Sequence, residues 1–65
     1  MNISLNGTIV QTQAQTVAQL LESLQISPIG VAVAVNDQVV RRTQHAEFAV
    51  SEGDRVEIIR AVQGG

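Results

Sequence analysis

The sequence predicts an α+β fold in which one main helix packs across a mixed sheet of four to five strands. An Asn-Gly dipeptide separates two short alternating segments near the N-terminus, which is typical of a β-hairpin. One helical stripe of apolar residues follows, and the remaining chain alternates short apolar segments with turn residues. A length of 65 residues and a net charge of −2 leave room for one small domain.

Residues 1–5 and 8–12 are expected to form the first hairpin. Apolar and polar residues alternate in the first strand, as in a strand with one buried face. Asn6 and Gly7 both tolerate the positive φ angles of a two-residue turn. With a loop of that length the apolar residues of the two strands face each other. Ile9 then falls on the opposite face of the sheet, which is therefore expected to be partly covered.

Residues 16–24 are expected to form the helix. Thr16 and Gln19 have the spacing of a capping box, in which the hydroxyl and the amide each satisfy an N–H group at the helix start. So short a helix is marginal alone, so its apolar stripe must pack on the sheet. Ser27 and Pro28 are expected to end it, because a residue before proline avoids the α region. The stripe comprises Val17, Leu20, Leu21 and Leu24.

The segment 31–35 is an unbroken apolar run, which is typical of a strand covered on much of both faces. An Asn-Asp turn and a short strand at residues 39–40 follow. The segment 43–50 is less periodic, and a short strand or a 3₁₀ turn is expected to bring its apolar residues to the core. His45, within that segment, is expected to be exposed and without a role.

Residues 55–62 are expected to form the last strand. Gly53, in the preceding Glu-Gly-Asp turn, occupies a position that needs positive φ. Val56 and Ile58 should point to one face of the sheet, and Ile59 to the other. A hairpin that leads into a crossing helix suggests a β-grasp roll. In that fold the last strand lies parallel to the first in the middle of the sheet.

Composition argues against several kinds of site. The sequence has no cysteine, so it has no disulfide, thiolate metal site or thiol nucleophile. One histidine is too few for a histidine-rich metal site, and one aromatic residue makes no platform for bases. The negative net charge argues against nucleic acid as a partner. No apolar run approaches the ~20 residues of a membrane span, and no signal-type segment is seen. A cytoplasmic protein without a membrane partner is expected.

The most informative feature is the pair Gly64 and Gly65. The chain is expected to divide into a β-grasp domain over residues 1–62 and a flexible tail over residues 63–65. Two residues without Cβ let an extended chain enter a narrow slot. Residues 62–65 can reach roughly 13 Å. Such a tail presents one reactive group, the Gly65 α-carboxylate, although a frayed and solvated end is the alternative.

Four segments in the second half of the chain carry a family resemblance. They are Ala34-Val35-Asn36, Val39-Val40 with Arg42, Glu52-Gly53-Asp54-Arg55-Val56-Glu57-Ile58, and Ala61-Val62-Gln63-Gly64-Gly65. Over the whole chain, they resemble the ubiquitin-like sulfur carrier proteins of thiamine biosynthesis. The last segment is the more specific, because other β-grasp proteins share the turn and strand before it. Arg41 stands where the family commonly has proline, which is expected to loosen an edge segment.

The resemblance implies a carrier rather than an enzyme, with no cofactor of its own. In this family an adenylyltransferase of the ubiquitin-activating type uses ATP to make an acyl-adenylate at the position of Gly65. A persulfide sulfur from a donor such as a cysteine desulfurase then replaces AMP and leaves a thiocarboxylate. Thiazole synthase takes up that sulfur for the thiazole ring.

Partner contacts are expected on and beside the tail. Gln63 and Gly64 belong to the tail, and Val62 lies at its root. Ile59, if it points outward, is either covered by neighbouring loops or part of a partner-binding patch, and we favour the patch. Arg42, one of two adjacent arginines, is expected to guard a strand edge against aggregation, and contact with an acidic partner is the alternative.

Other functions stay open on the sequence. The small subunit of molybdopterin synthase has the same fold and terminal chemistry but a different acceptor. A ubiquitin-like protein modifier would form isopeptide conjugates. A β-grasp regulatory or RNA-binding module would need neither a free terminus nor glycines there. An enzyme is the weakest candidate, because no nucleophile–base pair or metal cluster is apparent.

Overall fold

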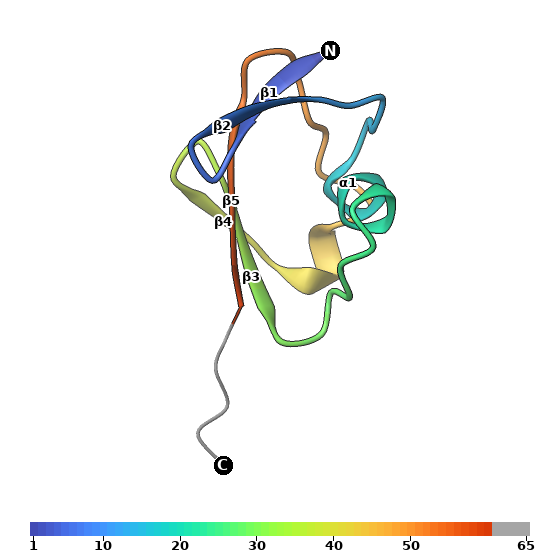
Figure 1. Cartoon of the computed structure of the whole chain (residues 1–65). Coiled ribbons are helices and arrows are strands. Elements are labelled where there is room, and N and C mark those ends of the chain that lie inside the picture. Colours follow the sequence, from blue (N-terminus) through green and yellow to red (C-terminus); the bar gives the residue numbers. More distant parts are fainter. Residues whose placement is uncertain (61–65) are drawn as a thin grey trace.

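A computed structural model describes residues 1–60, which form a single sheet with one α-helix packed on it (Figure 1). The strand order is β2-β1-β5-β3-β4. The central strand β5 pairs in parallel with β1 and antiparallel with β3, which confirms the predicted β-grasp arrangement. The elements are β1 (Asn2–Leu5), β2 (Thr8–Gln11), α1 (Val17–Ser23), β3 (Val31–Val35), β4 (Gln38–Val40), the 3₁₀ turn η1 (Arg42–Gln44) and β5 (Arg55–Arg60).

Both β-hairpins close through two-residue turns. Asn6 and Gly7 have φ angles of 49° and 85°, and Asn36 and Asp37 have φ angles of 51° and 69°. Two successive positive φ angles are characteristic of the turn type whose twist matches that of the flanking strands. The first turn sets the predicted register of β1 and β2, with apolar residues opposite one another.

The two faces of the sheet differ in burial, and two expectations about the outer face are wrong. Ile9 is 70% exposed rather than partly covered. In β3, Val33 and Val35 are buried, whereas Ala32 is exposed and Ala34 is only partly buried. The reason is that α1 and η1 both lie on the same side of the sheet (Figure 1). The apolar run of β3 is therefore buried on one face only.

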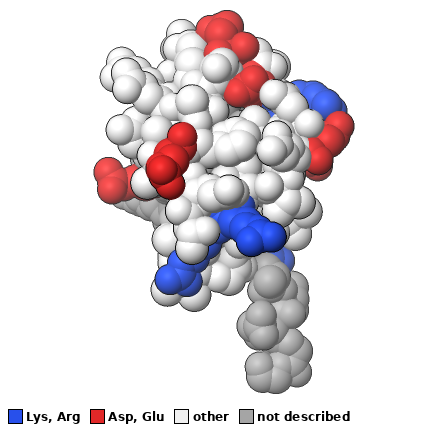
Figure 2. Space-filling model, turned by 180° about the vertical axis from the view of Figure 1, so that it is seen from behind, with Lys and Arg blue, Asp and Glu red and all other residues white. Residues whose placement is uncertain are grey.

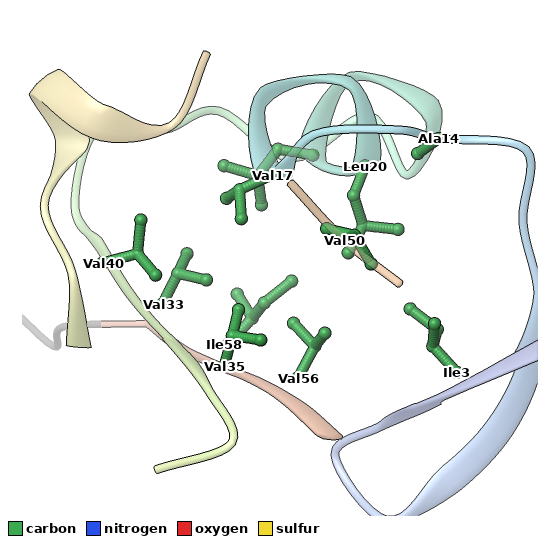
Figure 3. Packing of buried hydrophobic residues seen from close by; sticks show 11 residues of the cluster. Ile3, Ala14, Val17, Leu20, Val33, Val35, Val40, Val50, Val56 and Ile58 are labelled. Carbon is green, nitrogen blue, oxygen red and sulfur yellow. The ribbon is translucent and has the colours of Figure 1, made fainter. Parts of the chain in front are cut away.

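The core lies between that covered face and α1. Figure 3 shows the strand side chains pointing toward Val17 and Leu20 of the helix, with Val50 from the loop before β5 between them. The predicted helical stripe therefore packs on the sheet, although Leu24 is only partly buried. The buried cluster comprises Ile3, Ala14, Val17, Leu20, Leu21, Val33, Val35, Val40, Val50, Val56 and Ile58.

The start of α1 departs from a full capping box. The Thr16 hydroxyl accepts a hydrogen bond from the Gln19 N–H at 3.2 Å, as predicted. The Gln19 side chain, however, accepts from the N–H of Gln15 at 2.8 Å and not from that of Thr16. Thr16 forms an isolated β-bridge with Ala49. The chain is extended at Thr16, and this places the Gln15 N–H within reach of the Gln19 side-chain amide.

The end of α1 lies earlier in the chain than predicted. The helix stops at Ser23, before the Ser-Pro pair, and Gln25 adopts a φ angle of 58°. The Ile26 N–H then donates to the carbonyl of Leu21 at 2.9 Å, and the Gln25 N–H donates to that of Glu22 at 3.0 Å. These two bonds are those of a Schellman motif. A left-handed residue, and not the proline, therefore ends the helix.

The expectation that His45 is exposed is wrong. The residue is only 5% exposed, and its Nδ1 atom is buried without a hydrogen-bond partner among residues 1–60. The chain after η1 returns over the core, where the Ala18 N–H donates to the carbonyl of His45 at 2.9 Å. This path turns the imidazole inward. Among residues 1–60, no helix is long and apolar enough to cross a bilayer.

Candidate functional site at the end of the last strand

The candidate site begins where β5 ends. Arg60 is the last residue that the structure describes. The predicted site residues Val62, Gln63, Gly64 and Gly65 lie outside the described residues, as does the predicted boundary between domain and tail. What the structure defines is therefore the position and the surroundings of the strand that leads to them.

One edge of β5 is held by Asn6. The strand β1 ends at Leu5, but the Asn6 side chain continues its hydrogen bonding. Asn6 Oδ1 accepts from the Ile58 N–H at 2.9 Å, and Nδ2 donates to the Ile58 carbonyl at 3.2 Å. The Asn6 N–H also donates to the carbonyl of Val56 at 2.9 Å. The amide thus takes the place of a further strand residue. Sequence reasoning assigned Asn6 to the hairpin turn alone, and no local pattern could have indicated this second role.

The other edge of β5 is held by β3. The register pairs Ala32 with Ile59 and Val31 with Arg60, so the pairing continues to the last described residue. Hydrogen-bonded neighbours on both sides fix the direction of β5 at Ile58. The segment that follows thus starts from a well-defined point at the end of the molecule remote from the N-terminus (Figure 1).

Ile59 projects from the face of the sheet away from α1. It is 62% exposed, so it is not covered by neighbouring loops in the described part of the chain. Its partner in β3 is Ala32, and the next alanine, Ala34, pairs with Val39, which is 71% exposed. The small alanines let Ile59 and Val39 protrude. The exposure of Ile59 is what a contact patch requires, and its role as a contact stays a prediction.

Arg42 lies on the other side of the sheet from Ile59. It is exposed in η1 and lines a groove of about 460 Å³ between α1 and the turn, together with Leu21, Ile26 and His45. Alternation along β5 directs Ile59 to the outer face. Ile59 and Arg42 therefore do not form one patch. A partner that contacted both would have to surround the end of β5.

Positive charge gathers at one end of the molecule. Among the described residues the only ion pair joins Arg55 to Asp37 at 2.9 Å, and both side chains are exposed. The other arginines are Arg41, Arg42 and Arg60, all exposed. In Figure 2 blue side chains lie in the lower part of the molecule and red ones lie above them, apart from the blue beside red at upper right. The end of β5 is thus locally basic in a chain of net charge −2.

The fold and this site define a class of protein. A β-grasp sheet whose central strand is held on both edges and leads to a Gly-Gly pair is the architecture of ubiquitin-like carrier proteins. Residues 1–65 match the model of the ThiS family. The chain belongs to the ThiS family.

Similar proteins support the same family assignment. The chain is 39% identical over 66 residues to the sulfur carrier protein ThiS of Escherichia coli, with all of both chains covered. It is 30% identical to the sulfur carrier protein ThiS of Thermus thermophilus, covering 94% of this chain and 95% of that one. It is also 35% identical to part of a thiazole synthase of Paramagnetospirillum magneticum, of which it covers 20%.

Solved structures give the same result. The crystal structure of the thiamine biosynthesis protein ThiS from Geobacter metallireducens superposes with a TM-score of 0.86 at 29% identity, with all of both chains covered. The solution structure of a thiamine biosynthesis protein from the same organism gives a TM-score of 0.81, covering 100% of this chain and 88% of that one. The predicted fold and the predicted function, a sulfur carrier of thiamine biosynthesis, are confirmed.

Proposed function

We propose that the Gly65 α-carboxylate is the group on which this protein carries sulfur. The observation that supports this most directly is the position of β5. This central strand is bonded to Asn6 on one edge and to β3 on the other, and it directly precedes residues 61–65. A fixed starting point lets a short segment reach a partner's active site in a defined direction. The proposal requires the Gly65 carboxylate to be free, with residues 63–65 acting as a tail beyond a domain of residues 1–62.

The chemistry begins with activation of a poor electrophile. A carboxylate oxygen of Gly65 attacks the α-phosphate of ATP, and pyrophosphate leaves as the acyl-adenylate forms. The terminal sulfur of a persulfide attacks the acyl carbon and AMP leaves, which gives an acyl disulfide. A thiol reduces the disulfide and releases the thiocarboxylate. The sulfur is later transferred to the acceptor, and an oxygen from water or from the acceptor replaces it on the acyl carbon, so Gly65 returns to a carboxylate.

In this proposal the chain is the substrate of its partners and not a catalyst. The ATP site and the catalytic groups belong to an adenylyltransferase of the ubiquitin-activating type, so the chain holds no cofactor of its own. The persulfide belongs to a sulfur donor such as a cysteine desulfurase. Gly64 has no Cβ, which suits a narrow entrance to such active sites. The reaction consumes ATP, and we place it in the cytoplasm.

Thiazole synthase is the proposed sulfur acceptor. Support comes from the relative that is named a thiazole synthase and contains a segment like the whole of this chain. A polypeptide that joins the two units keeps carrier and acceptor together. We propose that Ile59, beside Ala32 and Val39 on the outer face, contacts such a partner, with Val62 and Gln63 leading into it. Arg42 would meet an acidic group on the partner.

Adenylation can be tested separately from sulfur transfer. The adenylyltransferase encoded by the same organism is incubated with radiolabelled pyrophosphate, ATP and the carrier, and label entering ATP is measured. Wild-type carrier should support this exchange. Gly64→Val should abolish it, because a β-branched side chain restricts the backbone and widens the chain near its end. Its unfolding midpoint should equal that of the wild type, because the buried cluster is built from residues 3–58. Exchange at the wild-type rate with Gly64→Val would contradict the proposed role of the tail.

A further inference from the structure

We propose that a groove on the helix side of β5 is a second docking surface for the sulfur acceptor, and that it binds an apolar side chain flanked by a carboxylate. We call it the root groove. It has a volume of about 320 Å³ and lies next to the last described residue of β5. Its lining residues are Ile26, Ser27, Ile29, Gly30, Val31 and Arg60.

The loop from α1 to β3 builds the apolar wall of the root groove. The left-handed turn at Gln25 sends the chain away from the helix, and Ile26 packs partly against the core. The Ile29 N–H donates to the Ser27 hydroxyl at 3.2 Å, and Gly30 turns the chain into β3 with a φ angle of 79°. The result is that Ile29 stands 70% exposed. An exposed apolar side chain that lines a groove offers a partner apolar area to bury.

Arg60 supplies the charge of the root groove. It pairs with Val31 across β3 and β5, and by alternation it shares the helix side with Val56 and Ile58. It is the only charged residue that lines this groove among the described residues. The larger groove beside α1 is also lined by Ile26, so the two grooves adjoin. Its charged lining residues are Arg42 and Glu22, of opposite sign. An apolar wall beside a guanidinium selects an apolar side chain with a neighbouring carboxylate, because Arg pairs with carboxylates through two parallel bonds.

The position of the root groove favours a partner that surrounds the segment after Arg60. A relative named thiazole synthase contains a segment like the whole of this chain, which favours the acceptor over the adenylyltransferase as that partner. This inference rests on the proposed function, in which the acceptor must surround the segment after Arg60. A protein that does so meets the root groove on the helix side of β5 and Ile59 on the outer side. The root groove thus continues the proposed interface around the end of the strand. Contacts on both faces of the sheet would fix how the carrier is rotated about the axis of β5 relative to its partner. A contact on one face alone would not fix that rotation.

Two exposed isoleucines provide a matched test. Ile29 in the root groove and Ile9 on β2 are both 70% exposed, so aspartate at either position should leave the fold intact. The thiazole synthase of the same organism is titrated with each fluorescently labelled carrier, and the dissociation constant is measured. Ile29→Asp and Arg60→Glu should each weaken binding about tenfold or more, equivalent to ~1.4 kcal/mol. Ile9→Asp should stay within about twofold of the wild type.

The outcomes separate this inference from the proposed function. Wild-type affinity for Ile29→Asp, an equal loss for Ile9→Asp, or no binding of the wild type to thiazole synthase would each overturn the docking proposal. Raising the salt concentration should weaken binding of the wild type but not of Arg60→Glu, because salt screens an attraction in the wild type and a repulsion between carboxylates in the variant. The proposed function is tested by whether wild-type carrier accepts sulfur at Gly65, which does not depend on these affinities.

Discussion

The side-chain amide of Asn6 forms two hydrogen bonds with the backbone of Ile58, which lies 52 residues further along the chain. The residue that closes the first hairpin thereby also fixes the strand that leads to the Gly-Gly pair. Its φ angle of 49° places the amide against β5, at the point where β1 has already ended. One side chain thus couples a local turn to the position of the functional end of the protein.

Replacing Asn6 by glycine should therefore destabilise the protein. Glycine keeps the left-handed turn but removes both hydrogen bonds, each worth roughly 0.5–1.5 kcal/mol, so a loss of about 1–3 kcal/mol is expected in urea unfolding. Amide exchange at Ile58 should accelerate in Asn6→Gly more than exchange at Ile59, which pairs with Ala32 on the other edge. Unchanged stability together with unchanged exchange at Ile58 would contradict the role given to this amide.

Gln25 should be replaceable by glycine with a gain in stability. It ends α1 at a φ angle of 58°, where a side chain is strained and glycine is not. Gln25→Gly should raise the free energy of unfolding by about 0.5–1 kcal/mol, after the larger entropy of unfolded glycine is counted. Gln25→Ala is the control, since alanine keeps the strain and should give no gain. Chemical denaturation measures the free energy of unfolding of both variants. A lower value for Gln25→Gly than for the wild type would refute this account of the helix end.

Proline at position 41 should stabilise the edge segment. Arg41 has φ −69° and ψ 148°, angles that proline adopts without strain. Its N–H makes only a long contact of 3.4 Å with the Gln44 side chain, so little bonding is lost. Arg41→Pro should gain about 0.4–1 kcal/mol by restricting the unfolded chain. Arg41→Ala should show no such gain in thermal unfolding. A lower midpoint for Arg41→Pro would mean that the N–H matters more than its distance indicates.

Replacing His45 by an apolar ring should stabilise the protein. Its buried Nδ1 has no hydrogen-bond partner in the part of the chain that the structure describes, and an unsatisfied buried polar group costs roughly 1–3 kcal/mol. His45→Phe should raise the free energy of unfolding by about 1 kcal/mol, because it removes the unsatisfied group and the groove beside α1 can take the larger ring. His45→Gln keeps a polar group there and should not stabilise. Urea unfolding midpoints compare the three proteins, and a destabilised His45→Phe would contradict this account of the buried imidazole.

Local sequence patterns predicted most of the fold. The Asn-Gly turn gave the register of β1 and β2, the helical stripe gave the buried face of α1, and alternation gave the orientation of Ile58 and Ile59. These features depend on residues close together in the sequence. The parallel pairing of β1 with β5 followed from the order of the elements, because few topologies connect a hairpin, a helix and later strands.

Features that depend on distant neighbours could not be predicted in this way. The second role of Asn6 needs the position of Ile58, and the burial of His45 needs the path of the chain after η1. The outer face of β3 was expected to be covered because apolar runs usually are, but here alanine occupies both outer positions, of which one is exposed and one partly buried. The root groove arises because Gln25 ends the helix early, a conformation that glutamine rarely adopts.

The central claim is that sulfur is carried on Gly65. The most direct measurement is the intact mass of the carrier after incubation with its adenylyltransferase, ATP, a cysteine desulfurase with cysteine, and a reducing thiol. The wild type should exchange one carboxylate oxygen for sulfur, and tandem fragmentation should place the change at Gly65. A variant that lacks Gly65 should fold as the wild type does and remain unmodified, because its carboxylate stops one residue short of the bound ATP. Conversion of that variant as efficiently as the wild type would contradict the account.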